Sequence, residues 1–284
     1  MTGTGTQTDP YIVSEYSEFM SAIVMSGAYI KCADNTVWDM NEIDPTGEIY
    51  HNTNRTVNFK QIDGNGAIIK NFYSMFNGRI FEIKTSGAVI KNLKFHNLSL
   101  LNDTELFFSY CDTYTVQNCE FTGIVSNRSD VLSILGTNGS YCTLNSKQNL
   151  FVLDIFNEGH VITTGNSYTY IKYTDCAFII GGNYTTHGNS YYTTITNCYF
   201  EGILPMKVFR CDGNYNVINA NIQQGCNLSS MTALTVVNTD KCDDIDSLQV
   251  SSKIIKATSK EMKDPVFLRN NGFPVPIPTN WGDD

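Results

Sequence analysis

Two glutamates lie at comparable places in two apolar segments, and their chemistry depends on the distance between them. Glu82 belongs to the segment RIFEI and Glu105 to ELFFSY. Alternation of side chains along a strand predicts that both point outward. Neighbouring strands stack about 4.8 Å apart, and glycosidases use two carboxylates roughly 5–10 Å apart as acid and base. The pair could cleave a polysaccharide, or it could belong to a polar solvent face on which Arg79 and Lys84 relieve the repulsion.

Further polar side chains are predicted on the same outward face. Ser109, Ser133 and Arg210 have the same phase as the glutamates within their own segments. His160 lies in EGHV beside Glu158, where it could act as a general base or occupy an ordinary surface turn. No residue stands out as catalytic, and the candidates are Glu82, Glu105, Arg210 and His160.

Tyrosines gather between residues 168 and 192, and the stretch GNYTTHGNSYY (182–192) is predicted to be a protruding loop. Exposed tyrosines stack on sugar rings and anchor protein interfaces. Tyrosines can equally stack on one another along the outside of a repeat protein, and that alternative stays open. The predicted carbohydrate or partner contacts are Tyr184, His187, Tyr191, Tyr192, Ser109 and Ser133.

The composition argues against several functional classes. The net charge is −9 and there is no run of Lys or Arg, so we expect no nucleic-acid partner. No stretch approaches 18 apolar residues, so we expect no membrane insertion. The nine cysteines include no CxxC pair, and Asp243 and Asp244 fit a solvated turn. We therefore expect neither a metal nor another cofactor.

A recurring pattern places an Asn or Asp after a short β-branched segment. Successive polar positions are 21, 26, 57, 22 and 22 residues apart, and Asn145 is predicted to divide the longest interval. A period of this size indicates stacked repeats, because one unit is too short to bury a core alone. The positions are Asn71, Asn92, Asn118, Asp175, Asn197 and Asn219.

Each repeat is predicted to contain three short strands. The strands fall at 79–83, 88–91 and 93–95 in one repeat, and at 105–110, 114–116 and 119–121 in the next. The Asn at the second turn can adopt a left-handed conformation and bond the amide of the next repeat. Cys119, Cys176 and Cys198 follow this turn and are predicted to be reduced core residues. Alternation also predicts that Phe81, Leu106 and Phe108 face the core.

The chain divides into three parts by composition. Residues 1–58 should hold a strand, an amphipathic helix at 15–25 that covers the end of the repeat, and an irregular first coil. Residues 59–250 carry the repeated coils. Residues 251–284 hold four of the seven prolines and should form a C-terminal cap or tail, because Phe267, Leu268, Phe273 and Trp281 need burial.

The repeat resembles the right-handed parallel β-helix, or pectate-lyase-like, superfamily. The resemblance covers roughly residues 3–250 and is carried by VQNCEF (116–121), ITNCYF (195–200) and DGNG before AIIKNF. It implies an all-β, single-stranded right-handed parallel β-helix with an N-terminal capping helix and a Pro-rich C-terminal tail. The chain lacks the paired aspartates and Gly-His-Gly of polygalacturonases and the calcium-binding aspartates of pectate lyases, so the resemblance assigns no catalytic residues to this sequence.

The resemblance extends to β-helices of bacteriophage tail spikes and virion appendages. It implies a virion structural or recognition protein that contacts host surface polysaccharide or other virion proteins, and a homotrimer is one assembly it implies. The start of the chain has no basic region or apolar run, so we expect no signal peptide and synthesis in the bacterial host cytoplasm. The alternatives are a depolymerase, either polysaccharide lyase or glycoside hydrolase, and a bacterial surface adhesin.

Overall fold

Parallel strands make up most of the protein. A computed structural model describes residues 1–101, 104–109, 113–126, 134–137, 143–156, 170–182, 193–196, 198–204, 215–222, 227–228, 233–242, 249–250 and 252–273. Every pairing between two of the described strands is parallel, and an isolated antiparallel bridge joins Thr2 to Ile12. No described helix is long and apolar enough to cross a membrane.

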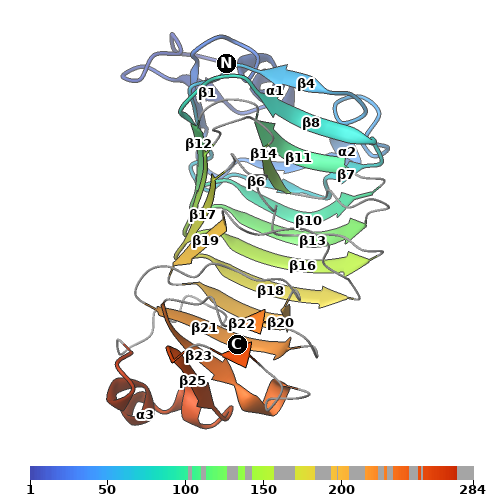
Figure 1. Ribbon diagram of the computed structural model, residues 1–284. Helices are drawn as coiled ribbons and strands as arrows, with labels where there is room; N and C mark the ends of the chain where they lie inside the picture. Colours follow the sequence, from blue (N-terminus) through green and yellow to red (C-terminus); the bar gives the residue numbers. More distant parts are fainter. Residues whose placement is uncertain are drawn as a thin grey trace.

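Three large sheets form the body of the molecule (Figure 1). Sheet A contains β1 (Tyr11–Val13), β2 (Tyr29–Cys32), β5 (Gln61–Asp63), β9 (Ala88–Lys91), β12 (Thr113–Gln117), β15 (Thr143–Lys147), β17 (Tyr170–Thr174) and β19 (Thr193–Thr196). Sheet B contains β3 (Val37–Asp39), β6 (Ile68–Lys70), β7 (Tyr73–Ser74), β10 (Lys94–Leu100), β13 (Glu120–Ser126), β16 (Leu150–Phe156), β18 (Ala177–Gly182), β20 (Tyr199–Leu204), β21 (Tyr215–Ile222), β23 (Leu234–Asn238) and β25 (Ile254–Ala257). Sheet C contains β4 (Arg55–Val57), β8 (Gly78–Ile83), β11 (Thr104–Ser109) and β14 (Leu135–Thr137).

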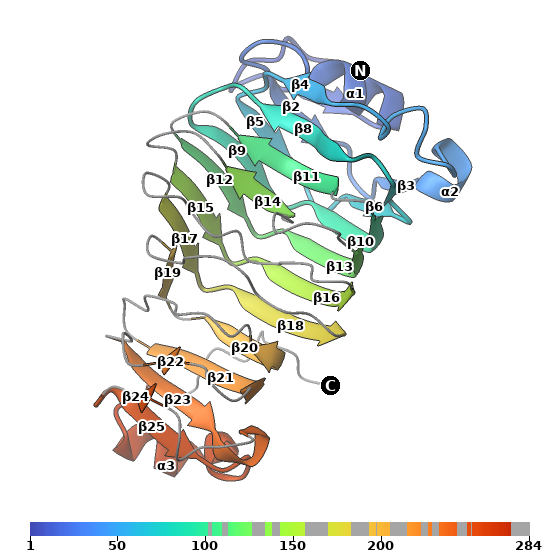
Figure 2. The ribbon, with the colours of Figure 1, turned by 45° about the vertical axis from the view of Figure 1, so that its right-hand side comes forward.

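The chain visits the sheets in the order C, A, B, and one such circuit is a coil. β8, β9 and β10 form one coil, and β11, β12 and β13 form the next, each strand pairing with its counterpart. The protein is therefore a parallel β-solenoid, which confirms the predicted parallel β-helix architecture (Figure 2). A separate pair, β22 (Asn227–Leu228) with β24 (Gln249–Val250), lies near the C-terminal end of the chain.

A column of phenylalanines fills the core beneath sheet B. Phe95, Phe121, Phe151 and Phe178 occupy one register position in consecutive coils. Their ring centroids are 5.6, 5.3 and 5.0 Å apart, with nearly parallel planes. Stacked aromatic rings contribute beyond the area they bury, so this column fixes the register between coils as well as stabilising the core.

The N-terminal helix α1 spans Tyr16–Ala22, within the predicted 15–25. It begins with a capping box in which the Glu15 and Glu18 side chains bond each other's backbone N–H groups. Tyr16 and Phe19 are buried and pack against Trp38, with ring centroids 5.4 and 5.2 Å from it. The other helical segments are α2 (Met40–Ile43), α3 (Pro265–Asn270), η1 (Thr239–Lys241) and η2 (Glu261–Lys263).

The structure corrects three positions of the predicted repeat. Gln148, not Asn145, occupies the turn after β15, because Asn145 lies inside that strand. Asn71 belongs to a second ladder, in which it accepts a 2.7 Å hydrogen bond from Asn97. Asn219 lies inside β21 rather than at a turn. Asn197 falls outside the described residues.

The predicted cysteine position is confirmed. Cys119, Cys176 and Cys198 are free thiols, fully buried after the turn that joins sheets A and B. Small apolar side chains suit a position where consecutive coils stack directly on each other.

The C-terminal segment packs against the outer side of sheet B. Leu268 and Phe273 form a second buried cluster with Val217 and Val236. The next residues along those strands, Ile218 and Val237, belong to the main core, so Val217 and Val236 face the opposite side. Trp281 and the final prolines lie outside the described residues.

Candidate functional site

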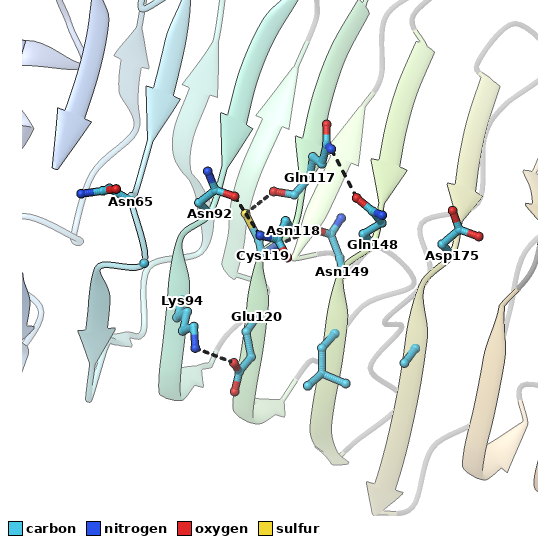
Figure 3. A pocket seen from close by; sticks show the side chains of 13 residues that line it. Asn65, Asn92, Lys94, Gln117, Asn118, Cys119, Glu120, Gln148, Asn149 and Asp175 are labelled. Atoms are coloured by element: carbon cyan, nitrogen blue, oxygen red, sulfur yellow. Dashed lines mark hydrogen bonds and ion pairs between the residues drawn. The ribbon is translucent and has the colours of Figure 1, made fainter. Parts of the chain in front are cut away.

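A polar groove follows the turns that join sheets A and B. One residue of each turn has a positive φ, between 50° and 56°, in five consecutive coils. Asn and Asp adopt this left-handed conformation more readily than most residues, because their short side chains can bond the local backbone. The five residues lie in one row across the coils (Figure 3). They are Asn65, Asn92, Asn118, Gln148 and Asp175.

Hydrogen bonds between coils hold the side chains of this row. The amide of Asn118 donates to Asn92 Oδ1 at 2.8 Å, and the amide of Asn92 donates to Asp63 Oδ1 at 2.9 Å. Gln117 Nε2 donates to Gln148 Oε1 at 3.3 Å. The predicted bonding between amides of successive coils is therefore confirmed. An amide has two N–H donors and two lone pairs, so one bond leaves capacity for a ligand.

A buried column supports the floor of the groove. Asn149 stands between Cys119 and Cys176 in this column, and its Oδ1 accepts from Cys119 N at 2.8 Å. Its amide donates to Val116 O at 2.9 Å and to Ser146 Oγ at 2.8 Å. Burial raises the pKa of the Cys119 thiol to about 12. The thiol is therefore protonated at neutral pH and is no nucleophile for a ligand in the groove.

Sheet B forms one wall of the groove, and the character of this wall changes along the solenoid. Lys94 and Glu120 are neighbours on β10 and β13, with Nζ and Oε2 3.7 Å apart, and His96 Nε2 lies 3.0 Å from Glu120 Oε1. Leu150 and Ala177 occupy the equivalent positions on β16 and β18. The groove has a volume of about 910 Å³, and amide side chains are the commonest kind in its lining, which also holds the charged residues Lys94, Glu120 and Asp175. It suits a ligand rich in hydrogen-bonding groups.

The described residues form no metal centre. No group of three or more His, Cys, Asp or Glu side chains among them could hold an ion. The carboxylates that line the groove, Glu120 and Asp175, lie on different coils separated by the coil of Leu150.

The predicted acid–base pair on sheet C does not form. Phe108 is the register partner of Glu82, and Arg79 is the partner of Glu105. The two glutamates are thus offset by three residues, about 10 Å along the strands. Each carboxylate binds a cation instead: Glu82 binds Lys84 at 2.9 Å and Glu105 binds Arg79 at 2.8 Å. The expectation that Arg79 and Lys84 relieve the repulsion is confirmed, and the expectation of side-by-side carboxylates is wrong.

Two residues predicted to face solvent on sheet C are buried. Glu105 is 5% exposed, and burial raises its pKa while Arg79 opposes the rise. Ser109 is fully buried as the partner of the core residue Ile83, and its Oγ donates to Ile83 O at 3.4 Å. Regular alternation fails here because Leu106 and Phe107, two successive residues, both enter the main core.

The same irregularity changes the aromatic residue that faces inward on β11. Phe107 stacks on Phe81 with centroids 5.3 Å apart, in the place predicted for Phe108. Phe108 lies beneath Arg79, whose guanidinium carbon is 3.8 Å from the ring centroid. The remaining predicted site residues lie outside the described residues: Ser133, His160, Tyr184, His187, Tyr191, Tyr192 and Arg210.

The repeated Asn at a left-handed turn is itself the sequence signal for the groove. Such a residue shapes the backbone and also leaves its side-chain amide at the surface. Gln148 was missed because glutamine is uncommon in this conformation. No protein-family model, curated protein or solved structure matches the chain. Its function is therefore inferred from the groove and from sheet C.

Proposed function

We propose that the protein is a structural recognition module of a bacteriophage particle and that it binds host surface carbohydrate through the polar groove. The observation that carries this proposal is the row of polar side chains along five coils, four of them amides, of which Asn92, Asn118 and Gln148 are held by bonds between coils. Side chains that are ordered before binding lose little rotamer freedom when a ligand arrives. A polysaccharide, which offers many hydroxyl groups along one direction, matches such a row.

The proposal also includes the handedness of the coil and the role of α1. We infer a right-handed coil of the pectate-lyase-like kind, with α1 covering the N-terminal end of the solenoid. Burial of Tyr16 and Phe19 against Trp38 supports the role of α1, because the first coil must be shielded from water. Other virion proteins are the further partners we propose, with a homotrimer as the assembly.

A depolymerase acting on the face of sheet C is the second candidate. One observation favours it: Glu105 is a buried carboxyl with a raised pKa, the kind of group that serves as a general acid. The position of Glu82 weighs against it, because the offset along the strands and the spacing between strands together put Glu82 about 11 Å from Glu105. Among the described residues of sheet C, no other carboxylate is in register beside Glu105. A surface adhesin is the third candidate.

The particle itself provides the first test. Purified virions from cells that express this protein should contain it as a stoichiometric component, detected by quantitative mass spectrometry. Free protein in the lysate, with none in the particles, would overturn the virion assignment, and protein on the bacterial surface would favour the adhesin. Size-exclusion chromatography with light scattering gives the oligomeric state.

Activity on polysaccharide separates the binder from the enzyme. The purified protein should migrate more slowly in gels that contain host polysaccharide than in gels without it. It should release no reducing ends and no unsaturated products from the polysaccharide. Release of products that stops in the Glu105→Gln variant, with folding unchanged by circular dichroism, would establish the depolymerase instead. Glu82→Gln is the matched control, because Glu82 lies on the same face and is paired with Lys84.

A further inference from the structure

The groove has a fixed spacing that limits which ligand fits. Parallel strands of neighbouring coils are about 4.8 Å apart, and one row residue projects from each coil. A ligand that uses the whole row must therefore offer a hydrogen-bonding group at every coil step. An extended, equatorially linked sugar chain advances by a similar distance per residue, whereas a compact or helical chain does not.

The lining also limits the chemistry of the ligand. Among the described lining residues none is aromatic, so the groove offers no ring to stack on a sugar face. Recognition must come from amide donors and acceptors, which match hydroxyl and acetamido groups. The lining contains one cation, Lys94, against the carboxylates of Glu120 and Asp175.

Charge disfavours acidic polymers in this groove. Lys94 lies 3.7 Å from Glu120, which partly neutralises it, and Asp175 is exposed at the far end of the row. The chain as a whole carries a net charge of −9. A uronate chain would bring negative charge to a negative surface, and desolvating its carboxylates would add to the cost.

We propose that the groove binds a neutral, extended polysaccharide whose chain runs along the solenoid axis, with one sugar residue on each coil. This inference rests on the proposed carbohydrate recognition and specifies its ligand. The row from Asn65 to Asp175 spans four coil steps, about 19 Å. The site therefore holds about five sugar residues.

A series of oligosaccharides tests the length and the class of the ligand. The probes are β-1,4-linked glucose and N-acetylglucosamine oligomers of two to eight residues, with oligogalacturonates as the acidic counterpart, titrated by calorimetry. Affinity should rise with each residue up to about five and then level off. The acidic series should bind at least tenfold more weakly, and the difference should shrink at high salt. Equal affinity for dimers and octamers would refute the axial site.

Glycine substitutions in the row test which residues bind. Asn118→Gly and Gln148→Gly remove the side chain while keeping a residue that adopts positive φ without strain. Each substitution should weaken binding of the five-residue oligosaccharide about 3- to 10-fold, which is the effect of losing one or two net hydrogen bonds. Asp175→Asn should leave neutral binding within twofold and should raise affinity for the acidic series.

Asn97→Gly is the matched control. Asn97 has the same conformation, with a φ of 57°, and donates a similar 2.7 Å bond to Asn71, but it does not line the groove. Its substitution should lower thermal stability as much as Asn118→Gly does, with affinity unchanged. Equal losses of affinity in both variants would mean that the row acts only on stability, which would refute the site.

The two levels of the proposal fail in different ways. If no polysaccharide from the host or the synthetic series binds, carbohydrate recognition itself is wrong. If a polysaccharide binds but the Asn118→Gly and Gln148→Gly variants bind it as tightly as the parent protein, recognition stands and the groove is not its site. Tight binding of the acidic series alone would contradict the ligand class while keeping recognition.

Discussion

Gln148 is the one residue of the row along the groove whose type does not suit its left-handed conformation. The other four members are Asn or Asp, which tolerate positive φ. For glutamine the left-handed conformation costs about 1 kcal/mol. Gln148→Asn should therefore raise the free energy of unfolding by about 0.5–1 kcal/mol, measured by urea denaturation. Lys147→Asn, on the preceding strand residue, should give no gain. A lower midpoint for Gln148→Asn would show that its bond with Gln117 matters more than the strain.

His51 makes stability depend on pH. It is fully buried; its Nε2 lies 2.9 Å from the Tyr16 hydroxyl and its Nδ1 3.6 Å from Asp44. Burial lowers the pKa of His51 to about 4, although Asp44 opposes the shift. Because the unfolded histidine titrates near 6.5, the unfolded state takes up the proton first. Stability is therefore complete above pH 6.5 and is lost as pH falls toward 4.

The measurable loss is about 2 kcal/mol between pH 7 and pH 5. Urea unfolding at the two values should show it, and the His51→Gln variant, whose side chain does not titrate, should show a loss smaller by that amount. Equal pH dependence in the two proteins would mean that other groups cause it. Both proteins share Glu105 and the other carboxylates remote from His51, so the contributions of those groups cancel in the comparison.

At the scale of the elements, α3 and Phe273 pack on the outer side of β21, β23 and β25, the last strands of sheet B. Leu268 is 5% exposed and packs in the cluster of Val217 and Val236, whereas Val266, on the same helix, is 59% exposed. Leu268→Asp should undock α3, because an unpaired carboxylate is costly in an apolar cluster. Trypsin should then cleave after Lys263 and Arg269 at least tenfold faster, while circular dichroism of the solenoid changes little.

Val266→Asp is the control for this change, since it places the same charge on the same helix in water. Its cleavage should match the parent protein. Light scattering gives a second measurement, because the exposed side of β21 and β23 should make the Leu268→Asp variant self-associate. Unchanged cleavage in both variants would mean that the segment does not depend on the cluster.

The elements that could be predicted from the sequence are those specified by local chemistry. The strands at 79–83, 88–91 and 119–121 and the turns at Asn92 and Asn118 were predictable, because β-branched segments and left-handed asparagines are visible in the residues themselves. Register was not predictable, since it depends on which strands pair. The offset of Glu82 from Glu105 and the pairing of Asn71 with Asn97 are consequences of register.

The groove was missed for a related reason. Its floor takes one residue from each of five coils, and neighbours in space are 26–30 residues apart in the chain. Burial of Ser109 was missed because two successive residues of β11 turn inward, and a pattern of strict alternation cannot represent that irregularity.

At the scale of the whole molecule, the coil is a removable unit. Deleting residues 93–118 would join Asn92 directly to Cys119, so that β13 follows β9 and pairs with β6 and β16. Each repeat contacts only its neighbours, so the shortened protein should fold, with a circular dichroism spectrum of the same shape. Deleting residues 93–105, half a coil, breaks the order of the sheets and should prevent folding.

The row along the groove would shorten with the solenoid, so the number of coils sets the length of the sugar chain that the groove binds. Removing one coil should lower by one the number of sugars at which affinity levels off, and duplicating a coil should raise it by one. Such changes alter the number of sugar residues that are bound, while the contacts to each sugar residue stay the same. A gene of this kind could therefore adjust the reach of its product by gain or loss of a single repeat, in steps rather than by degrees.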